Sequence, residues 1–212
     1  VPIRMLPPLA VAKGIPRNVD VLVVGMSEGG VREVPEAIAR AFSKRFGLSV
    51  EEMAVSLGVK AQADSKRTLP APGGGPRIVV VGLGSEQSDE DLRRAAGAGV
   101  RHAASLAENG GLSVAVSLGT AGSRQLAAVA EGALLGSYNY EPISTDAAKG
   151  GAVGAITVIQ PSDAKGADVT AAAEIVAQAV VTVREWVNTP ANLLYPESFA
   201  EHFDDAGCWM LV

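Results

Sequence analysis

Short runs of apolar residues, rich in valine and isoleucine, alternate along this chain with longer segments of helical periodicity. Apolar side chains at consecutive positions of a run are typical of strands that are buried on both faces. Four such runs are the strand candidates: Asp20–Gly25, Arg77–Gly82, Leu112–Leu118 and Ala152–Gln160. A fifth strand is expected at Leu57–Ala63, where apolar and polar residues alternate. The pattern predicts an α/β fold with a mixed, mostly parallel sheet flanked by helices.

Two of the expected helices have clear end signals. One begins after Ser88, whose hydroxyl can cap the helix while Asp91 stands three residues further on, and it should run to about residue 108. Another has Pro35 in its first turn and ends at Gly47. Its apolar stripe is expected to consist of Ala37, Ile38, Ala41, Phe42 and Phe46.

A third, longer helix is expected to begin near Asp168 and to end at Asn188 and Pro190. It carries apolar residues at spacings of three and four: Ile175, Val176, Ala179, Val180, Val183 and Val187. Twenty residues at 1.5 Å each extend about 30 Å, the diameter of a small domain. A helix of this length can link two bodies.

Composition limits the class of protein. The chain has 212 residues, of which 48% are hydrophobic and 4% aromatic, so it can build a core from aliphatic side chains and is not intrinsically disordered. Its 18 Lys and Arg against 23 Asp and Glu give a net charge of −5, which disfavours a nucleic-acid partner. Cys208 is the only cysteine and cannot form an internal disulfide. No apolar run reaches the roughly 18 residues that span a bilayer, so we expect a soluble cytoplasmic protein without a membrane partner.

Two glycine-rich connections follow predicted strands. Gly25–Gly29 fits the letters of the nucleophile elbow G-x-S-x-G, but the elbow should lead straight into a helix. Gly29, Gly30, Val31 and Arg32 intervene before the Pro35 helix, which favours a plain strand-to-helix connection. The same connection and Gly82–Ser85 can offer backbone N–H groups to a phosphate. Neither completes the dinucleotide fingerprint or the P-loop, so a steric role for these glycines is the simpler interpretation.

Potential metal ligands do not cluster in the sequence. His102 and His202 stand apart, and Asp89, Glu90 and Asp91 lie at a predicted helix N-terminus, where the helix dipole favours negative charge. A hydrolytic metal site needs several ligands that converge in one pocket. We therefore assign no catalytic, cofactor-binding or metal residue within this chain.

Three segments resemble the leucyl (cytosol) aminopeptidase family. The strongest is Arg184–Asn192, with the sequence REWVNTPAN, which is followed by Leu194, Pro196 and Ala200. The second is Glu131–Tyr138, with the sequence EGALLGSY, and the third is the strand Val79–Gly84 with the helix Asp91–Gly97 behind it. The resemblance covers most of residues 10 to 203 in the same order, and the sequence departs from the family pattern after about Glu201.

The resemblance implies that residues 1–167 are an N-terminal, macro-domain-like α/β domain. Residues 168–190 would be a linker helix and its stop, and residues 191–212 the start of a catalytic domain that is truncated or absent. In the linker region, Arg184, Asn188, Pro190 and Asn192 would have structural roles.

The same resemblance implies that the full-length enzyme is a homohexamer that removes N-terminal amino acids from peptides. It would use two divalent ions, Mn or Zn. The family's metal-binding stretch Asn-Thr-Asp-Ala-Glu-Gly-Arg does not occur in this sequence, so the chain alone is expected to be inactive.

A binding module is the alternative function, because macro-like folds hold ADP-ribose or phosphate ligands with glycine-rich loops. Residues Asp20–Val24, followed by Gly29 and Gly30, have a partial likeness to the first strand of such a domain. The likeness is incomplete, since Gly25 and Met26 replace the asparagines expected after that strand.

Overall fold

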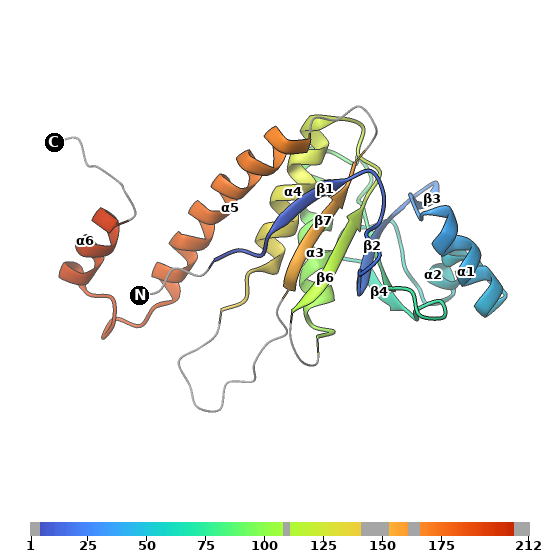
Figure 1. Cartoon of the computed structure of the whole chain (residues 1–212), viewed down its shortest axis with the longest axis horizontal. Helices are drawn as coiled ribbons and strands as arrows, with labels where there is room; N and C mark the ends of the chain where they lie inside the picture. The colour runs from blue at the N-terminus through green and yellow to red at the C-terminus, as the bar shows by residue number, and fades with distance from the viewer. Residues whose placement is uncertain (1–4, 108–110, 141–152, 161–165, 206–212) are drawn as a thin grey trace.

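The computed structural model describes residues 5–107, 111–140, 153–160 and 166–205, and these form one seven-stranded sheet with helices on both of its faces (Figure 1). The strands are β1 (Leu9–Ala12), β2 (Val21–Ser27), β3 (Gly30–Arg32), β4 (Lys66–Leu69), β5 (Arg77–Gly82), β6 (Leu112–Ser117) and β7 (Val153–Ile159). The helices are α1 (Glu36–Phe46), α2 (Val50–Ser56), α3 (Asp89–Ala104), α4 (Ser123–Ser137), α5 (Gly166–Asn188) and α6 (Pro196–Asp205).

The sheet is mixed and mostly parallel, as the sequence predicts. Its strand order is β1-β7-β6-β2-β5-β4, with β3 paired to β2 beside this path. Strands β1, β7, β6, β2 and β5 are parallel to one another, whereas β4 is antiparallel to β5 and β3 is antiparallel to β2. The four Val/Ile-rich runs are confirmed as β2, β5, β6 and β7, and residue 152 of the last run lies outside the described residues.

Side chains of the central strand β2 alternate between two cores. Val21 and Val23 pack in the core covered by α3, α4 and α5. Leu22 and Val24 pack on the opposite face, in the core that includes Phe42 of α1. Figure 1 shows α1 and α2 on one side of the sheet and α4 and α5 on the other. This three-layer arrangement explains why β2 is buried along its whole length.

Both predicted end signals are confirmed. Ser88 and Asp91 form a capping box at the start of α3, although α3 ends at Ala104, before the expected end near residue 108. Gly47 ends α1 in the left-handed conformation, with φ 71°. The predicted stripe of α1 is too wide, because only Ile38, Phe42 and Phe46 face the core while Ala37 and Ala41 are exposed.

The strand predicted at Leu57–Ala63 is wrong. Ser49 and Glu52 form a second capping box, which starts helix α2, and the chain then turns at Gly58, with φ 78°. The Val59 amide donates to the Ala54 carbonyl oxygen and closes this helix end. The edge strand β4 begins only at Lys66.

Helix α5 has two apolar faces. Its core-facing residues are Val169, Ala173, Ala177 and Val181, which are buried against the sheet and α4. Of the residues in the predicted apolar series, Val180 is partly buried, whereas Ile175, Val183 and Val187 are 72%, 52% and 79% exposed. Asp168 lies in the first turn of the helix, which begins at Gly166. In the described ranges, neither α5 nor any other helix has the length and apolar character needed to cross a bilayer.

Candidate functional site

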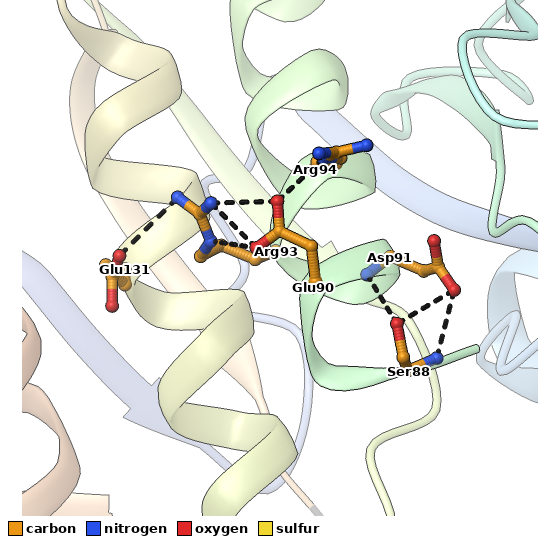
Figure 2. A network of polar contacts seen from close by, with 6 residues as sticks. All are labelled: Ser88, Glu90, Asp91, Arg93, Arg94 and Glu131. Atoms are coloured by element: carbon orange, nitrogen blue, oxygen red, sulfur yellow. Dashed lines mark hydrogen bonds and ion pairs between the residues drawn. The ribbon is translucent and has the colours of Figure 1, made fainter. Parts of the chain in front are cut away.

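The helical parts of the three segments that resemble the aminopeptidase family lie next to one another, because α4 contacts both α3 and α5. Arg93 of α3 and Glu131 of α4 form an ion pair with an Nη1–Oε1 distance of 3.6 Å (Figure 2). The guanidinium of Arg184, from α5, lies 5.6 Å from the centre of the Tyr138 ring. We call this region the helix junction.

Arg184 connects α5 to the end of α4. Helix α4 ends without a glycine cap, since Tyr138 follows it in an extended conformation, and it has no basic residue in its own last turn. Arg184 Nη1 donates to the Leu135 carbonyl oxygen at 3.4 Å. A cation at this end of a helix is favoured by the helix dipole. Arg184 therefore supplies from α5 the positive charge that α4 lacks.

Asn188, the last residue of α5, is held by two tyrosines. Its Nδ2 donates to the Tyr138 hydroxyl at 3.2 Å, and the Tyr140 hydroxyl donates to the Asn188 carbonyl oxygen at 2.9 Å. The Thr189 hydroxyl and amide both donate to the Glu185 carbonyl oxygen. These bonds fix the direction in which the chain leaves α5.

The other two predicted linker residues lie beyond this anchor. Pro190 is exposed, and its carbonyl oxygen accepts from the amides of Leu193 and Leu194 in the turn before α6. Asn192 is exposed in the same turn. The structure thus ties Arg184 and Asn188 to the domain and leaves Pro190 and Asn192 at the surface.

The acidic residues at the start of α3 are engaged in local contacts. Glu90 accepts from Arg93 Nε at 2.8 Å, from Arg93 Nη2 at 2.9 Å and from Arg94 Nε at 2.7 Å (Figure 2). These hydrogen bonds lower the pKa of Glu90 below its usual value. Asp89 forms an ion pair with Arg124 of α4. The cluster therefore stabilises the helix start, as its position relative to the helix dipole predicts.

The nucleophile-elbow interpretation fails in three dimensions. Ser27 is the last residue of β2, and the chain turns back into the antiparallel strand β3 instead of entering a helix. The Ser27 hydroxyl is buried and donates to the Gly30 carbonyl oxygen at 3.1 Å. The hydroxyl hydrogen of Ser27 is therefore engaged by a carbonyl oxygen, whereas a catalytic serine donates to a general base.

Backbone amides of the two glycine-rich connections have partners within the protein. The Val31 amide donates to the Glu51 carboxylate at 3.3 Å. In the second connection, the amides of Leu83 and Gly84 donate to the carbonyl oxygens of Met26 and Ala61. These donors are therefore not available to a phosphate, and the ADP-ribose alternative gains no support from these loops.

His102 takes part in a structural contact. Its Nε2 lies 2.8 Å from the Thr68 hydroxyl oxygen of β4. Burial lowers the pKa of His102, and the positive charges of Lys66 and Arg67 lower it further. Across the described ranges, no three His, Cys, Asp or Glu side chains lie close enough together to hold a metal ion. The described residues do not fit a metal centre of the hydrolytic type.

The profile described as "Cytosol aminopeptidase family, N-terminal domain" matches residues 23–147, which include most of β2, strands β3 to β6 and helices α1 to α4. The chain belongs to this family. A probable cytosol aminopeptidase from Cutibacterium acnes is 38% identical over 205 residues, which cover 94% of this chain and 39% of the relative. One from Micrococcus luteus is 37% identical, over 85% of this chain and 36% of the relative. The chain thus spans under two fifths of the length of these relatives.

Solved structures of similar proteins have the same fold. A mutant of tomato leucine aminopeptidase aligns with a TM-score of 0.74 at 20% identity, over 95% of this chain and 42% of that one. The bottromycin maturation enzyme BotP in complex with Mn aligns with a TM-score of 0.60 at 25% identity, over 88% of this chain and 36% of that one. The sequence matches therefore show the family, and the structural matches show the fold. This chain carries the N-terminal domain of the family.

Proposed function

We propose that this chain is the non-catalytic N-terminal part of a metal-dependent leucyl aminopeptidase that releases N-terminal amino acids from peptides in the cytoplasm. The main support is the match of residues 23–147 to the N-terminal domain of the cytosol aminopeptidase family. The likeness to macro domains stays a prediction, and so does the hexameric assembly that the family resemblance implies.

The two divalent ions, Mn or Zn, would bind in the remaining part of the full-length enzyme. The proposal is supported by the bound Mn named for BotP and by the scattered positions of potential ligands in the described part of this chain. Glu90, Asp91 and Glu131, which could supply carboxylates, already have partners at the helix junction or in a helix cap. We derive no catalytic step from the residues of this chain.

The domain would act by holding the start of the catalytic part in place. Its anchors are the contacts of Arg184 and Asn188 with the end of α4 and with the two tyrosines that follow it. Between these two anchors in the sequence, Trp186 of α5 packs edge-on against Phe199 of α6, with ring centres 5.1 Å apart. These contacts set the position of α6, which would be the first element of the next domain.

The remaining part of the enzyme would also cover the open face of α5. A cavity of about 850 Å³ lies between α5 and the segment Met5–Pro8, and its lining includes Ile175, Val183 and Trp186. Large apolar side chains gathered in a hollow are typical of surfaces that pack against another body. This face is continuous with the exit of the chain toward α6.

A chimera tests the proposal. Residues 1–192 of this chain would be joined to the remaining C-terminal part of the Cutibacterium acnes relative, and hydrolysis of leucine p-nitroanilide would be measured with Mn²⁺ before and after chelation. We expect chelator-sensitive turnover by the chimera and much weaker turnover by the C-terminal part alone. Equal activity of the two would contradict a supporting role for the domain. An inactive chimera beside an active intact relative would contradict the proposed place of this chain in such an enzyme.

A further inference from the structure

A small groove lies between α3 and α4, on the side of these helices that faces away from the sheet. Its volume is about 210 Å³. Its floor consists of small or aliphatic residues of the two helices, and in the described part of the chain its charged lining consists of four arginines and one aspartate. The floor residues are Gly97, Ala98, Gly132, Leu135 and Gly136, and the charged residues are Arg93, Arg94, Arg101, Arg184 and Asp64.

Glycines make this groove shallow and bring backbone to its floor. An added Cβ at Gly132 would overlap the Arg93 carbonyl oxygen, and one at Gly136 would overlap the Gly97 carbonyl oxygen. The pairing of Arg93 with Gly132 and of Gly97 with Gly136 shows that the two helices run parallel. Arg101, one turn beyond Gly97, therefore lies near the end of α4, where Arg184 also lies.

The arginines of the groove differ in how far they are neutralised. Arg93 is paired with Glu90 and with Glu131. Arg94 donates from its Nε to Glu90. Neither of its Nη groups has a hydrogen-bond acceptor among the described residues. Arg101 has no hydrogen bond or ion pair with another side chain in the part of the chain that the structure describes. Arg184 donates one long hydrogen bond, at 3.4 Å, to the Leu135 carbonyl oxygen and lies over the Tyr138 ring, but it pairs with no carboxylate among the described residues. Positive charge is thus concentrated toward the Arg101 and Arg184 end.

We propose that this groove binds a doubly charged phosphate group, either free or as a monoester. Guanidinium groups match phosphate oxygens in geometry and form strong, charge-assisted hydrogen bonds with them. The groove is smaller than the roughly 300 to 1,000 Å³ of pockets for larger organic ligands, so it accommodates one such group and not a nucleotide. A dianion is favoured over a chloride ion because the lining includes Arg94 and Arg101 from α3 and Arg184 from α5, and several guanidinium groups can share the oxygens of one phosphate.

Nuclear magnetic resonance titration of the ¹⁵N-labelled chain with sodium phosphate at constant ionic strength tests the site. We expect saturable shifts at the amides of Gly97, Gly132 and Gly136, and none at Gly47, which ends α1 on the other face of the sheet. Sodium chloride of the same ionic strength should not reproduce them. Glycerol 3-phosphate distinguishes the two sources, since tighter binding of this monoester points to an organic phosphate and tighter binding of phosphate points to the free ion.

Three variants sharpen the titration. Arg101→Gln should weaken the affinity for phosphate about tenfold, through the loss of charge-assisted hydrogen bonds. Asp64→Asn should strengthen it, because a negative charge leaves the lining. Arg40→Gln is the matched control, since Arg40 lies on α1 at the other face of the sheet and should leave the affinity unchanged. Shifts that fail to saturate, equal shifts with chloride, or equal effects of Arg101→Gln and Arg40→Gln would overturn the proposal.

Discussion

Helices α4 and α5 cover the same face of the sheet, but the domain completes the packing of only one of them. In α4, the apolar residues Leu126, Val129, Ala133 and Leu134 are all fully buried. Helix α5 buries a narrow stripe and leaves large apolar side chains such as Ile175 in contact with solvent. Helix α4 therefore completes its apolar packing within the described residues, whereas α5 keeps a second apolar face, which we propose is covered by the remaining part of the enzyme.

The largest expected effect comes from placing a charge on each face of α5. Ala177→Glu puts a carboxylate at a fully buried position without a partner, so we expect a loss of more than about 4 kcal/mol in the free energy of unfolding. Val183→Glu, at a half-exposed position, should change it by less than about 0.5 kcal/mol. Urea denaturation of both variants measures these changes in the free energy of unfolding. Similar losses in the two would show that the faces do not differ as described.

The next largest effect concerns the close approach of α3 and α4. In an ordinary helix, Gly→Ala gains about 1 kcal/mol of stability. Gly132→Ala should instead lose about 2 kcal/mol, because the new methyl group would overlap the Arg93 carbonyl oxygen. Gly75→Ala serves as the control, since an added Cβ there lies 3.4 Å from its nearest neighbours. A stabilised Gly132→Ala variant in thermal unfolding would contradict the tight helix contact.

A smaller effect is expected at the anchored end of α5. Tyr140→Phe removes the hydroxyl that donates to the Asn188 carbonyl oxygen, a bond worth about 1 kcal/mol. Amide hydrogen exchange should then become faster at residues 185–189 while α4 keeps its protection. Tyr195→Phe, which alters an exposed tyrosine in the turn before α6, should leave these rates unchanged. Equal rates in the wild-type chain and Tyr140→Phe would show that the tyrosine does not hold the helix end.

The smallest effect is a pH dependence that arises outside α4 and α5. The pKa of His102 is lowered in the folded chain by burial and by Lys66 and Arg67, so the unfolded chain binds a proton more readily. The free energy of unfolding should therefore decrease as the pH falls below about 6.5, the usual value for histidine. Urea denaturation between pH 5 and 8 measures this slope, and His102→Gln should reduce it. If the slope of the free energy of unfolding against pH is the same in His102→Gln as in the wild-type chain, the pH dependence arises from other titratable groups.

Sequence patterns were sufficient for the centre of the sheet and insufficient for its edges. The runs that form β2 and β5 are apolar at nearly every position, a pattern that only doubly buried strands satisfy. Helix α2 was missed although Ser49 and Glu52 carry the same capping-box signal as Ser88 and Asp91. The short edge strand β4 reads KRTL, and such a polar segment has no periodicity that predicts a strand.

The faces of α5 and the helix junction could not be predicted from local sequence. Spacings of three and four residues fit Val169, Ala173 and Ala177 as well as they fit Val176, Val180 and Val183, so periodicity alone does not say which face meets the core. Tyr138 and Asn188 are 50 residues apart and meet only through tertiary packing. Family resemblance singled out both segments without indicating that they touch.

Our main proposal is that this folded N-terminal domain belongs to an enzyme whose catalytic residues lie elsewhere. Its most direct test is hydrolysis of leucine p-nitroanilide by the purified 212-residue chain in the presence of Mn²⁺, with the intact Cutibacterium acnes relative as the positive control. We expect no turnover above the buffer rate for the chain alone. Turnover that depends on Mn²⁺ and disappears on chelation would contradict it.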